Sequence, residues 1–371
     1  MALPSAAGWQ AFHLFYHGDR DAALRHFVRP AVAALLAERR IDRFFFVRYD
    51  LGGPHLRLRL RQAPGSGSAE GVASVAATIE QHAAAFLAER PSVSPLDPEH
   101  LRRQAEARHA AAPDPQGAGV FPDNTLVRQP FEPEVERYGD GEILGHSLDF
   151  FTLSSAHALE AITRFGDDLP RRRLGFALRT LLTMAHGLAP EAEELAVLLS
   201  YRPGGPTQSP TALRMHGLAD QAFEAQREPY LDLLRRHFAA LNEALAGIPT
   251  VGPPEPGSAA YLGVAARRLA GLTHRAGLEA GPEAGPEARR RIAASHLHMT
   301  ANRLGLNTAA ELYVGRLLWR AARDLAEADP GAFGETPSAD PALERPEPLG
   351  ELLAPLLDRL AATAVVPAGR R

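Results

Sequence analysis

A short segment near the N-terminus has the arrangement of side chains best suited to chemistry on an anion. Residues 55–61 read His-Leu-Arg-Leu-Arg-Leu-Arg, an alternation of period two that is typical of a β-strand. The leucines therefore point to one face and the polar side chains to the other: His55, Arg57, Arg59 and Arg61. Such a row of guanidiniums stays charged at physiological pH, so it is tolerated against water and useful where an anion binds. The segment alone leaves both interpretations open.

A second polar segment, residues 133–139, reads Pro-Glu-Val-Glu-Arg-Tyr-Gly. If it is extended, Glu134 and Glu136 share one face and Arg137 lies on the other. The simpler interpretation is a local ion pair, worth under about 1 kcal/mol if it is exposed. A carboxylate and a guanidinium that act together in catalysis are the alternative.

The third segment is Ser-His-Leu-His-Met-Thr-Ala-Asn-Arg-Leu-Gly, residues 295–305. On a helix Ser295, His298 and Asn302 share a face. His296 diverges from His298, and Gly305 suits a helix C-cap. A histidine with an amide one turn away could transfer a proton from one fixed tautomer, or it could be a buried histidine with its hydrogen bonds satisfied.

The composition excludes several kinds of chemistry. The chain of 371 residues has no cysteine and no lysine, so thiolate nucleophiles, disulfides, P-loop lysines and Schiff bases are excluded. A net charge of −4 gives no general attraction to nucleic acid or anionic membrane. We expect no bound metal, because His13 and His17 on a predicted strand have no carboxylate at a suitable spacing. No apolar run approaches a membrane span of roughly 18 residues, and we expect a cytoplasmic protein.

The hydrophobic periodicity predicts an α+β fold, with an antiparallel sheet in the N-terminal third packed against a largely helical remainder. We expect a single domain over residues 1–330, with a probable insertion at 91–122, and a Pro-rich tail with one helix over 331–371. Strands are predicted at 9–17, 43–49 and 55–61, with a Gly-Gly-Pro turn between the last two. Helices are predicted at 20–40, 70–89, 98–111, from 142, and at 170–187, 189–200, 210–246, 258–275, 288–304, 308–327 and 348–362. A low-complexity linker is predicted at 279–286.

The three polar segments occur in an order that resembles the C-terminal domain of class I lanthipeptide dehydratases and its free-standing thiopeptide relatives. The resemblance starts at Trp9 and continues through Arg-Phe-Phe-Phe-Val-Arg-Tyr and Gly-Pro-His-Leu-Arg-Leu-Arg (43–59), the segment at 133–139, and His-Met-Thr-Ala-Asn-Arg-Leu-Gly (298–305). It spans roughly residues 9–325. The resemblance implies an enzyme that acts on a ribosomally made precursor peptide, leader plus core, and eliminates glutamate from glutamylated Ser or Thr to give dehydroamino acids.

The resemblance also implies the residues of the site, and no cofactor. The positions that match the elimination site are Arg57, Arg59, Glu134, Arg137 and His298, and those matched for substrate binding are Arg48, His55 and Asn302. Elimination requires a group that takes the α-proton and cations that stabilise the enolate and the departing carboxylate. We therefore expect the guanidiniums and one imidazole to converge around a single pocket.

The resemblance leaves other functions open. Several positions differ from the pattern of many eliminating members, namely Phe131, Asp140 and Ser154. A sister branch resembles the same fold used as a pyridine synthase, which joins two dehydroalanines in a formal [4+2] cycloaddition and expels the leader peptide. A non-catalytic peptide-binding subunit of a split dehydratase is a further alternative. Partners implied besides the precursor are a separate glutamylating subunit and a second copy in a homodimer.

Overall fold

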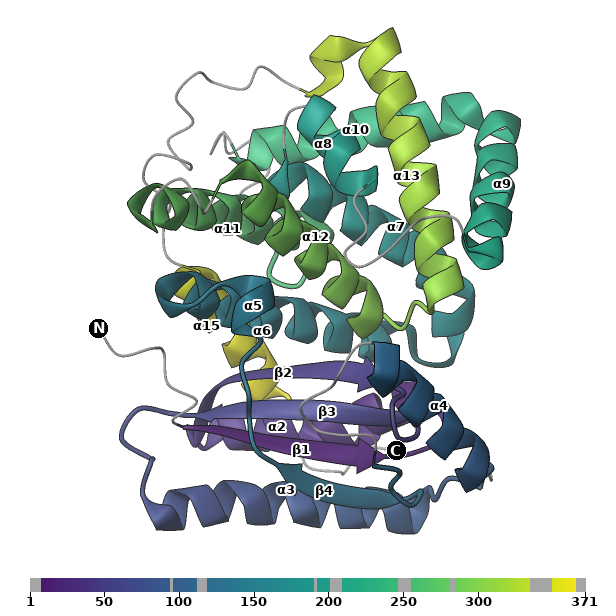
Figure 1. The fold of residues 1–371 in the computed structure, drawn as a ribbon. Coiled ribbons are helices and arrows are strands. Elements are labelled where there is room, and N and C mark those ends of the chain that lie inside the picture. The colour runs from purple at the N-terminus through teal and green to yellow at the C-terminus, as the bar shows by residue number, and fades with distance from the viewer. Residues whose placement is uncertain are drawn as a thin grey trace. The chain divides into compact units, whose positions relative to one another are not determined.

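The computed structural model describes residues 8–93, 96–111, 119–189, 192–200, 209–245, 255–280, 285–333 and 349–364. The described chain forms one four-stranded antiparallel sheet near its N-terminus and is helical elsewhere, which confirms the predicted α+β class (Figure 1). The strands are β1 (Trp9–Phe15), β2 (Ile41–Tyr49), β3 (His55–Gln62) and β4 (Thr125–Gln129). The helices are α1 (Arg20–Ala23), α2 (Arg29–Ala37), α3 (Ala69–Glu89), α4 (Pro98–Ala111), α5 (Val135–Tyr138), α6 (Gly141–Phe165), α7 (Leu169–Leu188), α8 (Ala192–Ser200), α9 (Pro210–Ala225), α10 (Arg227–Leu245), α11 (Ala259–Ala280), α12 (Pro286–Arg303), α13 (Thr308–Ala328) and α15 (Gly350–Ala362), with π or 3-10 turns η1 (Leu24–Val28), η2 (Gly166–Asp168) and η4 (Pro330–Phe333).

The described chain divides into two compact units, and each is treated by itself below. The sheet unit contains residues up to 133 together with the C-terminal residues from 357, and the helical unit contains residues 134–356. The single domain over 1–330 with an insertion at 91–122 stays a prediction. The predicted linker at 279–286 and the Pro-rich part of the tail lie partly outside the described residues, at 281–284 and 334–348.

The sheet has the strand order β2-β3-β1-β4, and every neighbouring pair is antiparallel. The predicted turn between β2 and β3 is present, and glycine is required there. Gly52 has φ +80°, and a Cβ atom on it would lie 2.2 Å from the carbonyl oxygen of Gly119. Edge strand β4 was not predicted, because its five residues, Thr-Leu-Val-Arg-Gln, carry little apolar signal.

The alternation in β3 puts its leucines and its arginines on opposite faces, as predicted. Leu56, Leu58 and Leu60 are buried on the face that also carries Phe12 and Phe46. The strand register places His13, Phe15, Phe45 and Tyr49 on the arginine face. Arg59 is only 7% exposed and His55 1%. Arg59 and His55 are therefore largely shielded from solvent, whereas the Arg61 side chain is 33% exposed.

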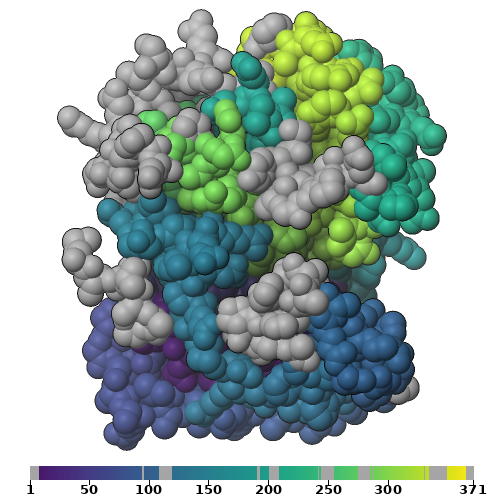
Figure 2. Space-filling model, viewed as in Figure 1, coloured from purple at the N-terminus to yellow at the C-terminus, as the bar shows by residue number. Residues whose placement is uncertain are grey.

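The helical unit is built on long amphipathic helices. In α6 the residues at predicted i, i+3/i+4 spacing are all buried: Leu144, Leu148, Phe151, Ser155, Leu159 and Ile162. Helix α11 packs against α7 and α6, and α13 packs against α9. Figure 2 shows α9 and α13 side by side at the surface of this unit.

One local prediction is wrong, and one condition considered for the sequence is not met. A single helix over 210–246 is interrupted at Gln226, where φ −138° and ψ 35° are not helical. The cause is Pro229, which has no N–H and is tolerated only in the first turn of a helix, so α10 must begin just before it. The segment with Glu134 and Glu136 is not extended, because Val135–Tyr138 forms the short helix α5.

Candidate active site

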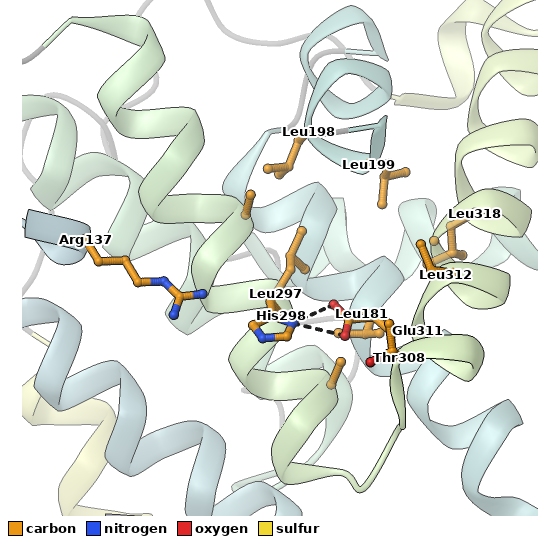
Figure 3. A pocket seen from close by; sticks show the side chains of 13 residues that line it. Arg137, Leu181, Leu198, Leu199, Leu297, His298, Thr308, Glu311, Leu312 and Leu318 are labelled. Carbon is orange, nitrogen blue, oxygen red and sulfur yellow. Dashed lines mark hydrogen bonds and ion pairs between the residues drawn. The ribbon is translucent and has the colours of Figure 1, made fainter. Parts of the chain in front are cut away.

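One pocket of the helical unit contains two of the predicted site residues. Its cavity volume is about 240 Å³, and Figure 3 shows the side chains around it. His298 of α12 and Arg137 of α5 contribute the predicted imidazole and guanidinium. The other lining residues are mainly leucines and small residues from α7, α8, α12 and α13: Leu181, Leu198, Leu199, Ala294, Leu297, Ala301, Thr308, Glu311, Leu312, Gly315 and Leu318.

The imidazole of His298 is held by a carboxylate that the sequence analysis missed. Its Nδ1 lies 2.8 Å from Oε1 and 3.0 Å from Oε2 of Glu311 (Figure 3). The His298 side chain is 42% exposed and that of Glu311 24%. The sequence offered one usable signal, which is a glutamate in the first turn of a helix that begins soon after the histidine helix ends. The arrangement gives the pocket an oriented group that can accept or donate a proton.

Short capping structures fix this pair of helices. Helix α12 ends at Arg303, and Gly305 follows with φ +81° and an N–H donated to the carbonyl of Asn302. This is the C-terminal glycine that the sequence predicted. Asn307 then caps α13 by accepting the N–H of Ala310. A connection of only a few residues therefore positions His298 against Glu311.

Arg137 reaches the pocket from the short helix α5. Its Nε–H donates to the hydroxyl oxygen of Ser295 at 2.9 Å, and its Nη1 lies 3.4 Å from Oε2 of Glu134. The predicted local ion pair is thus present, with Glu134 at 61% exposure. Among the described residues, Glu134 and Asn302 do not line the pocket.

Three buried residues lie close in sequence to the predicted site residues: His296, Arg303 and Tyr138. His296 is completely buried and shares a 3.1 Å hydrogen bond with the Ser147 hydroxyl, and burial holds its pKa well below the usual range. His296 and His298 diverge as predicted, one into the core and one to the pocket. Arg303 is also buried, with its guanidinium carbon 4.7 Å from the centre of the Phe151 ring, and desolvation lowers its pKa to about 10. Burial likewise raises the pKa of Tyr138, whose ring contacts Phe151.

In the sheet unit, Arg57 is fixed by two aromatic neighbours. Its guanidinium carbon lies 3.6 Å from the centre of the Tyr49 ring, and its Nε–H donates to Nε2 of His55 at 3.1 Å. The Nδ1–H of His55 donates to the carbonyl of Gly53 at 2.7 Å. Burial and the nearby arginines lower the pKa of His55 to about 3, so the ring is neutral. His55, which the resemblance assigned to substrate binding, therefore has both ring nitrogens in hydrogen bonds within the protein.

Arg59 and Arg48 lie on different faces of the sheet. Arg59 is paired with Ala11 and Phe45 across the neighbouring strands and shares the face of Arg57. Arg48 is opposite Leu56 and forms a buried ion pair with Asp21 at 2.5 Å. The structure therefore brings Arg57 and Arg59 together, and it does not bring Arg48 to them.

The predicted site residues fall into two groups that belong to different units. Arg57 and Arg59 belong to the sheet unit, and Glu134, Arg137 and His298 belong to the helical unit. Their convergence around one pocket stays a prediction.

The described residues also limit two other kinds of site. Within that part of the chain, no three His, Asp or Glu side chains are grouped so that they could hold a metal ion. His13 lies on β1, whereas His17 lies beyond its end. None of the described helices combines the length and apolar character needed to cross a membrane.

Comparisons with known proteins place the chain in a family. The family described as the C-terminal part of lantibiotic biosynthesis dehydratases matches residues 9–322. The pyridine synthase TbtD from thiomuracin biosynthesis has a similar structure, with a TM-score of 0.66, 24% identity, and coverage of 86% of this chain and 99% of that chain. The tRNA-dependent lantibiotic dehydratase MibB from Microbispora sp. 107891 matches with a TM-score of 0.55 and 21% identity, over 89% of this chain and 29% of that chain. No curated protein matches by sequence. These two likenesses establish a shared fold, and the match over residues 9–322 shows that the chain belongs to the family of lantibiotic biosynthesis dehydratase C-terminal domains.

Proposed function

We propose that this protein matures a ribosomally made precursor peptide of the lanthipeptide or thiopeptide type by eliminating glutamate from glutamylated Ser or Thr. Membership of a lantibiotic biosynthesis family supports a peptide substrate. The observation that carries the proposal is the imidazole of His298, oriented by Glu311 in a pocket that Arg137 also lines. The class of enzyme is a lyase that acts on a peptide.

The reaction needs three events that these side chains can serve. The imidazole of His298 takes the α-proton of the glutamylated residue, and the electron pair of the C–H bond forms the new double bond between Cα and Cβ. The bond from Cβ to the ester oxygen breaks, and glutamate leaves with that electron pair as a carboxylate. The positive charge of Arg137 stabilises the enolate oxygen that develops on the peptide carbonyl.

The predicted arginines of the sheet unit are candidates for binding a carboxylate. Arg57 and Arg59 present guanidiniums, which hold carboxylates with two parallel hydrogen bonds. We propose that these two arginines bind a carboxylate of the precursor peptide, and that Glu134 orients Arg137 through their ion pair. Asn302 and Arg48 are retained as candidates for contacts with the precursor.

A second candidate function is pyridine synthesis, by cycloaddition between two dehydroalanines with loss of water and the leader peptide. The specific observation in its favour is the structural likeness to TbtD, which extends over almost all of that chain. The same pocket would serve, because the cyclisation also needs proton transfers at a peptide amide. Elimination is preferred because each of the five positions that match the elimination site carries the matching residue type.

The two functions separate by substrate. The purified protein is incubated with a precursor that carries a glutamyl ester on Ser, and in parallel with a precursor that already carries two dehydroalanines. Elimination predicts that only the first peptide loses the mass of one glutamate. Loss of the leader peptide from the second precursor instead identifies a pyridine synthase.

A third outcome identifies a binding subunit. If neither precursor changes mass, while the protein raises the turnover of a glutamylating dehydratase partner, the chain is the non-catalytic peptide-binding component. That result contradicts the proposed elimination.

A further inference from the structure

We propose that Glu311 is a positioning residue that fixes the tautomer of His298, so that Nε2 is the atom that accepts the proton in the pocket. The inference deepens the proposed function, since it names the reacting atom of the same site. Glu311 itself touches no substrate in this proposal and acts only through the imidazole.

The hydrogen-bond geometry assigns the proton on the ring. Both carboxylate oxygens of Glu311 lie within 3.0 Å of Nδ1 of His298, and carboxylate oxygens accept hydrogen bonds. Nδ1 must therefore carry the hydrogen. In a neutral imidazole the other nitrogen, Nε2, then carries the lone pair.

The position of the ring makes the Nε2 lone pair available to accept a proton in the pocket. Nε2 lies on the side of the imidazole away from the carboxylate, and 42% of the side chain is exposed. Arg137 lines the same pocket, and its Nε–H is already donated to Ser295. A peptide bound there would meet a proton acceptor on one residue and a cation on another. The opposite tautomer would present an N–H donor to the substrate and leave the two acceptors facing each other.

The fold supplies a reason for the glutamate to be in place before substrate arrives. Glu311 is in the first turn of α13, where a negative side chain is favoured by the partial positive charge of the helix N-terminus. The backbone of the connection is fixed as well, because Leu306 and Gly305 donate their N–H groups to carbonyls at the end of α12. The backbone that carries Glu311 is thus held in place by hydrogen bonds outside the pocket.

The test reads the tautomer directly. The 15N chemical shifts of the His298 ring are measured on the full chain at a pH where the ring is neutral, and are assigned by their loss in His298→Ala. We expect a protonated Nδ1 and an unprotonated Nε2. In Glu311→Leu the acceptor is lost, and we expect Nε2 to become the protonated nitrogen, as in a free neutral imidazole. Glu311→Gln keeps an acceptor oxygen, and we expect it to keep the wild-type tautomer.

Activity and stability complete the test. Glutamate elimination should fall at least tenfold in kcat in Glu311→Leu, with KM little changed, and less in Glu311→Gln. Glu327→Leu is the matched control, since Glu327 lies on the same helix with its side chain 72% exposed, and it should leave both the tautomer and the rate unchanged. A role in folding alone would lower the Tm of the Glu311 variants without changing the tautomer.

The proposal is overturned if wild-type protein carries the proton on Nε2, or if Glu311→Leu retains the wild-type tautomer. Failure of the proposed function gives a different pattern, in which the tautomer responds as expected but no variant, wild type included, releases glutamate.

Discussion

The Nε–H of Arg57 donates a hydrogen bond to Nε2 of His55 across 3.1 Å. This bond requires His55 to be neutral with its proton on Nδ1, and the carbonyl of Gly53 accepts the hydrogen bond from that N–H. Tyr49 packs against the guanidinium of the same arginine. Arg57 is therefore held in one orientation by the residues around it, which is the arrangement expected where an anion must be met with little reorganisation.

Substituting His55 by leucine should release Arg57 and reduce turnover of the glutamylated precursor by about 10-fold to 150-fold. This is the effect of losing one hydrogen bond to a charged group, which is worth roughly 1.5–3 kcal/mol. The rate of glutamate release measured by mass spectrometry checks it. A double-mutant cycle with Arg57→Ala is the control, and the double variant should be no slower than Arg57→Ala alone. Additive effects would show that His55 does not act through Arg57.

If the proposed function is right, Arg59→Ala and His298→Ala should each abolish turnover and leave binding of the precursor largely intact, because the proposal gives these side chains roles in the reaction and none in holding the leader peptide. Mass spectrometry and a fluorescence binding assay measure the two properties. The matched control is Arg128→Ala, an exposed arginine on β4 whose register with Phe12 places it on the other face of the sheet. Near wild-type rates in both active-site variants would remove these residues from the site.

Gly315→Leu should inactivate the enzyme without destabilising it. Gly315 of α13 lines the pocket, so a leucine side chain there would occupy the volume that the proposed substrate enters. Replacing glycine within a helix also favours the helix by about 1 kcal/mol. We expect an equal or higher Tm with turnover reduced at least tenfold. Gly217→Leu is the control, because it makes the same change in helix α9, where an added Cβ meets nothing within 4 Å. Equal activity in the two variants would show that substrate does not enter this pocket.

The stability of the protein should fall as the pH is lowered from about 6.5 towards 4. His157 is buried, and its Nδ1–H donates to the Gly257 carbonyl while its Nε2 accepts from Thr180. Burial lowers its pKa from 6.5 to about 4. The unfolded chain therefore binds more protons in this window, and His157 alone contributes up to about 3 kcal/mol of stability that is present at neutral pH and lost below it.

Urea unfolding of wild type and His157→Gln at several pH values measures the contribution of His157 to the free energy of unfolding. The variant should lose less free energy of unfolding between pH 7 and pH 4.5 than the wild type does. The buried rings of His55 and His296 act in the same direction and remain in both proteins. Parallel pH profiles would show that His157 does not titrate with folding.

Much of the local structure could be predicted from the sequence. Alternation in residues 55–61 predicts strand β3 and its two faces, because successive side chains of a strand point in opposite directions. The spacing of Leu144 to Ile162 predicts the buried face of α6 for the corresponding helical reason. The break at Gln226 also has a signal in the chain, Pro229, although the apolar spacing continues across it.

The sequence by itself determined which elements form and which face of each is apolar. It also supplied an imidazole and several guanidiniums as candidates for proton transfer and anion binding. Only the tertiary structure decided that Arg59 and His55 are buried, that β4 pairs with β1 across more than a hundred residues, and that the carboxylate of Glu311 bonds to His298. The physical reason is that periodicity records the local geometry of a single element. A hydrogen bond between two helices depends instead on how they cross, which is set by the packing of the whole unit.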